Sequence, residues 1–175
     1  MVDVTERKAL EARLIHQAAH DSLTGLANRR AFDAHLAEQV AIALRHQRAL
    51  TLALVDVDHF KVINDHYGHA IGDRCLNRLA QLIMSNLQPS QRLFRYGGEE
   101  FVLLVSGSAA EAQALAERLR SEVEHTQLIR EAMITVSIGI ATKYSQEKLR
   151  AWMRRADDAM YEAKQQGRNR CCVAT

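Results

Sequence analysis

The sequence predicts an α/β sandwich in which helices cover a mixed β-sheet. Two observations lead to this fold class. Apolar runs of strand length, such as residues 50–57 and 132–142, alternate with amphipathic segments of helix length. Hydrophobic residues make up 47% of the chain and charged residues 25%, which is typical of a globular domain with a real core. The 175 residues fit one domain with a few residues to spare.

Composition also excludes several functional classes. The net charge of +2 is too small to indicate nucleic-acid or membrane binding. No signal peptide is visible and no apolar run approaches the ~20 residues that span a bilayer, so we expect a cytoplasmic protein. Three cysteines, Cys75, Cys171 and Cys172, are an odd number without C-x-x-C spacing. They favour a reducing compartment over a disulfide framework or zinc site.

Residues 2–20 predict an amphipathic N-terminal helix. Val4, Leu10, Leu14 and Ala18 recur at helical intervals among charged residues. This narrow apolar stripe is compatible with two arrangements. The helix could pair with a copy of itself, or it could fold back on its own domain.

Punctuating residues set the boundaries of the later elements. Asn28 is a suitable N-cap, Pro89 interrupts a helical pattern, and Gly167 is suited to the residue that follows a helix end. The predicted elements are a helix at 28–47, a strand at 50–57, helices at 60–66 and 70–87, a hairpin at Gly97 and Gly98, a helix at 108–125, a strand at 132–142, a helix at 145–166 and a strand at 171–173.

The first candidate site lies where the strand at 50–57 ends. Asp56 and Asp58 are two residues apart and therefore lie on one face of an extended chain. A carboxylate at the end of a buried strand is costly unless a cation or hydrogen bonds offset its desolvation. Asp56 could therefore bind a metal. Alternatively, both acids could cap the following helix, where Asp58 is well placed.

The second candidate site is the stretch RYGGEEF, residues 95–101. Its two glycines predict a two-residue hairpin turn. Because glycine has no side chain, a phosphate or metal-bound oxygen could approach the backbone of this turn closely. Glu99 and Glu100 could share Mg²⁺ with the neighbouring strand end. The alternative is an exposed hairpin tip with ordinary surface charges. No Walker-type phosphate loop, G-x-S-x-G elbow or H-E-x-x-H pattern offers a competing chemistry.

These stretches occur with further long motifs in a characteristic order. They are DSLTGLANRR, VDVDHFKVINDHYGHAIGD (residues 55–73), RYGGEEF, TVSIGIA and ADDAMYEAKQQGRN. Over residues 21–169 the chain resembles the GGDEF family of diguanylate cyclases, with the GGEEF variant of the motif. The resemblance implies the fold shared by nucleotidyl cyclases and polymerase palm domains, a mainly antiparallel sheet of about five strands flanked by helices.

The resemblance also implies an activity. Members condense two GTP molecules into cyclic di-GMP (c-di-GMP) and release two pyrophosphates, with each 3′-hydroxyl attacking the α-phosphate held by the other subunit of a homodimer. Mg²⁺, or Mn²⁺ in its place, is implied at two ions per GTP site. The alternative from another class is a catalytically silent module that binds GTP or c-di-GMP. A cyclase with relaxed base choice is a third, against which the presence of Asp73 argues.

The resemblance assigns the metal site to Asp56, the Val57 carbonyl, Glu99 and Glu100. Either glutamate could assist deprotonation of the 3′-hydroxyl. The implied substrate residues are Leu23 at the base pocket, Phe60 and Lys61 at the phosphates through their backbone amides, Asn64 and Asp73 at guanine, Gly97 and Gly98 under the nucleotide, and Lys164 and Arg168 at the terminal phosphates. Cations at a helix C-terminus are also favourable without any ligand, which is the alternative for Lys164 and Arg168.

One position departs from the family pattern. Many members carry an R-x-x-D product-inhibition site before the glycines, where this chain has Gln88 and Gln91. We therefore expect no feedback inhibition through that site. Asp21 and Arg95 are expected to brace the opening motif against the hairpin.

The N-terminal segment resembles a linker that follows a PAS sensor. We accordingly divide the chain into a signalling helix at 1–20 and a catalytic domain at 21–175. The sensor itself is expected to lie outside this chain.

Overall fold

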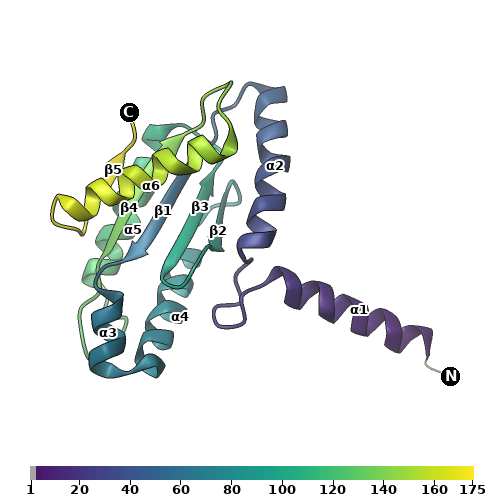
Figure 1. Cartoon of the computed structure of the whole chain (residues 1–175), viewed down its shortest axis with the longest axis horizontal. Helices are drawn as coiled ribbons and strands as arrows, with labels where there is room; N and C mark the ends of the chain where they lie inside the picture. The colour runs from purple at the N-terminus through teal and green to yellow at the C-terminus, as the bar shows by residue number, and fades with distance from the viewer. Residues whose placement is uncertain (1–2) are drawn as a thin grey trace.

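The computed structural model describes residues 3–175, so Val2 of the predicted first helix lies outside the described residues. A five-stranded sheet in the order β2-β3-β1-β4-β5 is covered by helices on both faces, while α1 extends away from the domain (Figure 1). The elements are α1 (Val4–Ala19), α2 (Arg29–His46), β1 (Thr51–Val57), α3 (Phe60–Tyr67), α4 (His69–Ser85), β2 (Gln91–Arg95), β3 (Glu100–Val105), α5 (Ala109–His125), β4 (Val136–Thr142), α6 (Leu149–Gln165) and β5 (Cys171–Val173).

The sheet is mixed and mainly antiparallel, which confirms the expected fold. β1 pairs antiparallel with β3 and with β4, and β2 with β3, whereas β5 pairs parallel with β4. The register places Asp56 of β1 opposite Glu100 on one neighbour and Ser137 on the other. Because β1 is central, the polar residues at its end are flanked by both neighbouring strands.

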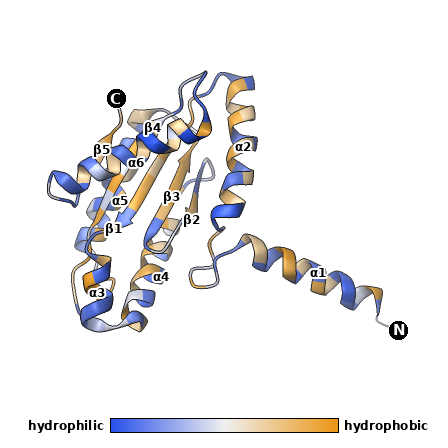
Figure 2. Ribbon diagram, in the orientation of Figure 1, coloured by the Kyte–Doolittle hydropathy of each residue, from blue (hydrophilic) through white to orange (hydrophobic). Residues whose placement is uncertain are grey.

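The core has one layer on each face of the sheet. Leu52 and Leu54 of β1 pack with Trp152 of α6 and Phe32 of α2. Ala53, Val55 and Val57 point to the opposite layer, which α3, α4 and α5 cover. All seven residues of β1 are buried, as expected for a central strand with both faces covered. In Figure 2 β1 is hydrophobic along most of its length and hydrophilic at its arrowhead.

Local signals account for several helix ends. The Asn28 side chain accepts a hydrogen bond from the Ala31 amide at 3.0 Å, which confirms the predicted N-cap. Ser108 and Glu111 form a reciprocal capping box at the start of α5. Gly167, directly after the α6 C-cap, has φ +114°, which favours glycine.

The strand predicted at 132–142 begins later than expected, at Val136. Val136 pairs with Val57, the last residue of β1. The preceding apolar residues therefore have no strand to pair with, and they enter a loop instead.

Helix α1 does not fold back on the core, so that arrangement is wrong. None of its residues is buried, and Leu10 and Leu14 are 59% and 56% exposed. Its main contacts within the domain are with α2. Pairing of α1 with a second copy stays a prediction.

No helix in residues 3–175 combines the length and apolarity needed to cross a bilayer. The three cysteines are free thiols; Cys75 is buried, and burial raises its pKa to about 11. Cys171 and Cys172 lie half-buried on β5.

Candidate active site

Asp56, at the end of β1, is a buried carboxylate in an unfavourable environment. It is 5% exposed, and its Oδ2 lies 3.0 Å from Nζ of Lys164 on α6. Burial raises the pKa of Asp56 to about 6, even though the lysine opposes the shift and favours the charged form. Glu99 and Glu100 add to the increase through like-charge repulsion. The structure therefore brings Asp56 and Lys164 into direct contact at the end of β1.

Glu100 begins β3 directly opposite Asp56. It is half-buried, and burial together with the negative charge of Asp157 raises its pKa, while Lys164 partly opposes the shift. Glu99 is also half-buried, and its carbonyl accepts a hydrogen bond from the Val57 amide at 3.3 Å. Repulsion among these carboxylates would be relieved by a cation.

The carboxylates do not by themselves form a complete metal cage. Within residues 3–175, no three His, Cys, Asp or Glu side chains converge closely enough to hold a metal ion. A cation bound here would need oxygen ligands from other sources, such as a backbone carbonyl, water or phosphate. Mg²⁺ commonly binds in this way, because it keeps several waters and shares substrate phosphates.

The hairpin exists, but its turn differs from the predicted two-residue type. Tyr96, Gly97, Gly98 and Glu99 all lie between the end of β2 and the start of β3. Within residues 3–175, the glycines with a positive φ are Gly25, Gly68 and Gly167. A left-handed backbone conformation is therefore not the reason for the glycines at 97–98. A Cβ at Gly98 would meet nothing within 4 Å. Gly98 therefore leaves the surface of the turn open, whereas a Cβ at Gly97 would lie 3.3 Å from Glu100 Oε2.

Arg95 braces the hairpin against the opening motif, as predicted. Its Nη1 lies 2.9 Å from Asp21 Oδ2, and its Nε and Nη2 donate to the carbonyls of Gly97 and Gly98 at 3.2 and 2.7 Å. Burial alone would raise the pKa of Asp21, but hydrogen bonds from Thr24 and Arg95 hold it below its usual value. The brace orients the turn carbonyls.

Asp58 neither caps α3 nor faces a cation, so the capping interpretation is wrong. The N-cap position is His59, which has φ 55° and makes no capping hydrogen bond through its side chain. The Asp58 carboxylate accepts hydrogen bonds from the Thr135 hydroxyl at 2.7 Å, the Ser137 hydroxyl at 2.6 Å and the Asn169 backbone amide at 3.0 Å. These bonds tie the end of β1 to the start of β4 and to the loop after α6.

The predicted guanine-reading residues lie at the junction of α3 and α4. Asn64 is half-buried on α3, and its side chain lies over Gly72 near the ring of Phe60. Asp73 follows in the first turns of α4 and is exposed. One turn further, Asn77 donates a hydrogen bond to the Leu23 carbonyl at 3.1 Å. Leu23, the residue predicted to line the base pocket, is thus attached to the same helix as Asp73.

The remaining predicted phosphate residues lie at element ends. Lys61 is exposed in the first turn of α3. Arg168 is half-buried in the loop after α6 and has φ 63°, and Asn169 beside it has φ 46°. Because Asp58 binds the Asn169 amide, this left-handed loop is anchored close to the end of β1.

Two charged residues near Glu100 were not predicted. Asp157 on α6 and Arg29 at the start of α2 both act on the pKa of Glu100, and the Arg29 guanidinium lies 4.6 Å from the centre of the Tyr96 ring. Asp157 precedes Lys164 by seven residues, two helical turns, so both lie on one face of α6. The seven-residue spacing from Lys164 was the sequence signal that could have placed Asp157 near the site.

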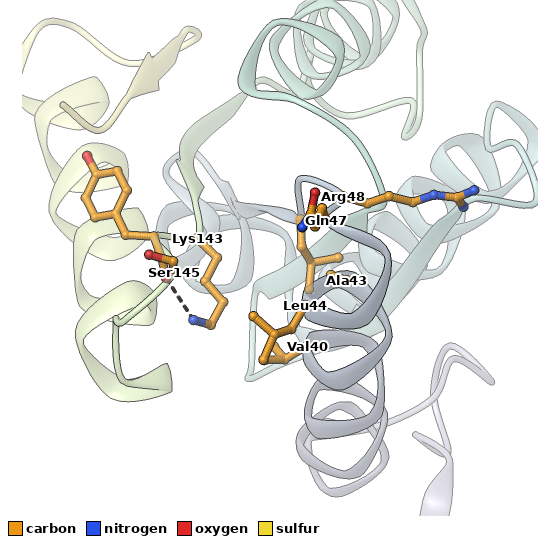
Figure 3. A pocket seen from close by; sticks show the side chains of 9 residues that line it. Val40, Ala43, Leu44, Gln47, Arg48, Lys143 and Ser145 are labelled. Atoms are coloured by element: carbon orange, nitrogen blue, oxygen red, sulfur yellow. Dashed lines mark hydrogen bonds between the residues drawn. The ribbon is translucent and has the colours of Figure 1, made fainter.

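A separate groove of about 310 Å³ lies between the C-terminal end of α2 and the segment after β4 (Figure 3). Val40, Ala43 and Leu44 line one side, and Lys143 lies on the other, where its Nζ donates to the Tyr144 carbonyl at 2.9 Å. None of the predicted site residues lines this groove. It is not part of the candidate active site.

The comparison with protein families decides the identity of the domain. The model described as "Diguanylate cyclase, GGDEF domain" matches residues 18–170. The chain belongs to the GGDEF family. The match covers the β1 end, the hairpin, the α3–α4 junction and α6, so the geometry above is that of a GGDEF domain.

Solved GGDEF structures share this fold closely. The coiled coil and GGDEF domain of DgcB from Caulobacter crescentus, in complex with c-di-GMP, is 36% identical with a TM-score of 0.90, covering 97% of this chain and 92% of that chain. The active GGEEF domain of a diguanylate cyclase from Vibrio cholerae is 33% identical with a TM-score of 0.81, covering 86% of this chain and 98% of that one.

Curated relatives of this GGDEF domain are longer proteins. Diguanylate cyclase DgcM of Escherichia coli K12 is 43% identical over 178 residues, covering 98% of this chain and 42% of DgcM. The bifunctional diguanylate cyclase/cyclic di-GMP phosphodiesterase MucR of Pseudomonas aeruginosa is 40% identical over 163 residues, covering 91% of this chain and 24% of MucR. The chain thus spans less than half the length of these relatives.

Proposed function

We propose that this chain is a diguanylate cyclase, which condenses two GTP molecules into c-di-GMP and releases two pyrophosphates. The observation that carries the proposal is the pair of opposed carboxylates with raised pKa, Asp56 and Glu100, beside the Lys164 ammonium. Such a cluster is unfavourable for the fold alone and suits a site that receives cations and phosphates. Membership of a family that includes DgcM supports the same reaction.

The donor set fits Mg²⁺, or Mn²⁺ in its place, at two ions per GTP. Asp56, Glu99, Glu100 and the Val57 carbonyl would hold them, and all offer the oxygen ligands that hard cations prefer. When bound, the ions neutralise phosphate charge and acidify the attacking 3′-hydroxyl. Glu99 or Glu100 then accepts the proton of that hydroxyl.

The other predicted residues orient the nucleotide. Asn64 and Asp73 read guanine, because a carboxylate accepts from the ring N–H and the exocyclic amine that adenine lacks, and Leu23 lines the base. The amides of Phe60 and Lys61, at the start of α3, meet the phosphates. The nucleotide lies over Gly97 and Gly98, while Lys164 and Arg168 neutralise the terminal phosphates.

The reaction requires two GTP sites to face each other, so the active form is a homodimer. Helix α1, with its exposed Leu10, Leu14 and Ile15, would supply a dimer contact outside the catalytic domain. We propose residues 1–20 as the signalling segment that sets how the catalytic domains at 21–175 meet. Regulation by a PAS-type sensor would then act on assembly, in the cytoplasm, where GTP is available.

Product feedback through the R-x-x-D position is not expected. Gln88 and Gln91 occupy it, and the Gln91 Oε1 accepts a hydrogen bond from the Gln88 amide at 2.9 Å. Neither residue offers the guanidinium or the carboxylate of that motif. Product could still occupy the active site itself.

Incubation with GTP and Mg²⁺ at several protein concentrations tests the proposal, with products separated by chromatography. We expect c-di-GMP formation to rise faster than linearly with protein and to disappear in Glu100→Gln. The matched control is Glu122→Gln, at an exposed position of α5. This variant should form c-di-GMP as fast as the wild type. Bound GTP without product at any concentration would contradict catalysis and indicate a nucleotide-binding module that signals by contact.

A further inference from the structure

Gly72 is a buried glycine inside helix α4. Glycine is a poorer helix former than alanine because it loses more backbone freedom on folding. Gly72 has no positive φ, so its backbone does not require glycine. The reason for this residue lies in the space that a side chain would occupy.

That space is filled by two predicted nucleotide-binding residues. A Cβ at position 72 would overlap Oδ1 of Asn64, and it would lie 3.0 Å from Asn64 Cγ and 3.2 Å from Phe60 Cζ. All three atoms belong to side chains. The nearest obstacle, Oδ1, is the free end of a flexible side chain, which can move without disturbing the helix.

Gly139 in β4 shows what a packing glycine looks like in the same molecule. A Cβ there would overlap the Ala156 carbonyl oxygen and the Met160 amide nitrogen, both in the backbone of α6. Gly139 thus permits close approach of a helix to the sheet. The three nearest atoms around Gly72 are side-chain atoms of α3, so the Asn64 amide and the Phe60 ring, rather than a neighbouring backbone, lie against α4 at this position.

Position 72 also lies between the two residues expected to read guanine. Asp73 is the next residue along α4, and the loop that joins α3 to α4 is closed by hydrogen bonds from the Gly68 amide to the Asn64 carbonyl at 2.9 Å and from the Gly72 amide to the Gly68 carbonyl at 3.2 Å. With the backbone of the junction held, a side chain at 72 would displace the Asn64 amide relative to the Asp73 carboxylate.

We propose that Gly72 is a positioning residue for guanine recognition, which lets the Asn64 side chain lie against α4 beside Asp73. The inference rests on the proposed function, because it takes Asn64 as a guanine ligand. Gly72→Ala should lower GTP affinity about tenfold, the effect of losing about one base hydrogen bond. Its melting temperature should be unchanged or higher, because alanine favours the helix.

The test measures binding rather than turnover. We would titrate 3′-deoxy-GTP and 3′-deoxy-ATP, which lack the attacking hydroxyl, into the wild type, Gly72→Ala, Asn64→Ala and the double variant in Mg²⁺. Each single variant should bind the guanine nucleotide about tenfold more weakly and discriminate less against adenine. The double variant should match Asn64→Ala, because removing the Asn64 amide also removes the collision.

Several outcomes would overturn the inference. They are wild-type guanine preference in Gly72→Ala, a further loss of affinity in the double variant relative to Asn64→Ala, or a double variant that fails to fold. The last two results would mean that Gly72 serves helix packing. A wild type that does not prefer the guanine nucleotide would instead contradict the proposed function, so the two failures are distinguishable.

Discussion

Asp56 and Asp58 are two residues apart and equally buried at 5% exposure, yet the groups that surround their carboxylates differ. Asp58 accepts three hydrogen bonds from two separate segments, the start of β4 and the loop after α6, at 2.6–3.0 Å. Asp56 has one lysine partner and two neighbouring glutamates, and its pKa is raised to about 6. Burial alone therefore does not separate a structural carboxylate from a functional one. The separation lies in whether the protein itself satisfies the charge.

The largest expected effect comes from Asp56→Asn. Cyclisation should fall by at least about 10³-fold, because the variant loses a charged ligand proposed for the metal ions that neutralise the phosphates. The free energy of unfolding should stay within about 1 kcal/mol of the wild type or rise, since a neutral amide replaces a desolvated carboxylate. A chromatographic assay and urea titrations at pH 7 measure both quantities. Strong destabilisation with activity retained would place Asp56 in the same class as Asp58.

Asp58→Ala should show the opposite pattern, in which the main effect is a lower free energy of unfolding. The buried Ser137 hydroxyl, the half-buried Thr135 hydroxyl and the Asn169 backbone amide would lose their acceptor, which should cost about 3 kcal/mol in urea unfolding. Asp33→Ala, at an exposed position of α2, is the matched control and should change stability by less than about 0.5 kcal/mol. If the two variants unfold alike, the hydrogen bonds of Asp58 do not hold the fold.

The pH dependence of stability should sharpen the contrast. Because the pKa of Asp56 is about 6 in the folded state and near 3.8 in the unfolded chain, the folded state binds more protons between these values. The contribution of Asp56 is therefore most favourable below 3.8 and is lost as the pH rises to 6, by on the order of 2 kcal/mol. Glu100, whose pKa is also raised, acts in the same direction.

The measurement is urea unfolding from pH 4 to pH 7 without divalent cations. Other carboxylates with a lowered pKa, such as Asp21 and Glu147, stabilise the fold less as the pH falls. The quantity to compare is therefore the difference in the free energy of unfolding between the wild type and Asp56→Asn. This difference should grow toward pH 7 in favour of the variant, and Mg²⁺ should reduce it. A difference that does not change with pH would mean that Asp56 titrates normally.

The smallest effect is expected for Lys164→Met. Without the Nζ charge 3.0 Å away, the charged form of Asp56 is less favourable, and stability at pH 7 should fall by about 1 kcal/mol. At pH 4 the loss should be smaller, since Asp56 is then mostly protonated. Lys148→Met, an exposed position before α6, serves as the control. An equal loss at both pH values would point to lost packing of the lysine side chain.

Much of the fold was predictable because its signals are local. The apolar run ending at Val57 could only be a buried strand, and Asn28 and Gly167 mark helix ends through their own backbone chemistry. The start of β4 was predicted too early because nothing within the apolar run at 132–142 marks where the strand begins. Its strand begins at Val136, opposite the last residue of β1.

The candidate site was predictable only in part. The motifs indicated Asp56 and Glu100, and the register places the two opposite each other. The alternative of a helix cap at Asp58 was wrong, and the sequence could not exclude it because the partners of Asp58 lie 77, 79 and 111 residues further along the chain. The turn type at Gly97 was predicted wrongly because a pair of glycines between strands does not by itself require a positive φ. Neither Gly97 nor Gly98 has one, and a Cβ at Gly97 would lie 3.3 Å from Glu100 Oε2.

By itself, the sequence of this protein determined the order of its helices and strands and the family to which the domain belongs, because both follow from short-range patterns of apolar, capping and motif residues. The tertiary structure alone decided which carboxylate is satisfied, where Lys164 lies, and why position 72 has no side chain. Each of these depends on contacts between segments distant in sequence, and desolvation and steric overlap exist only once those segments have packed together.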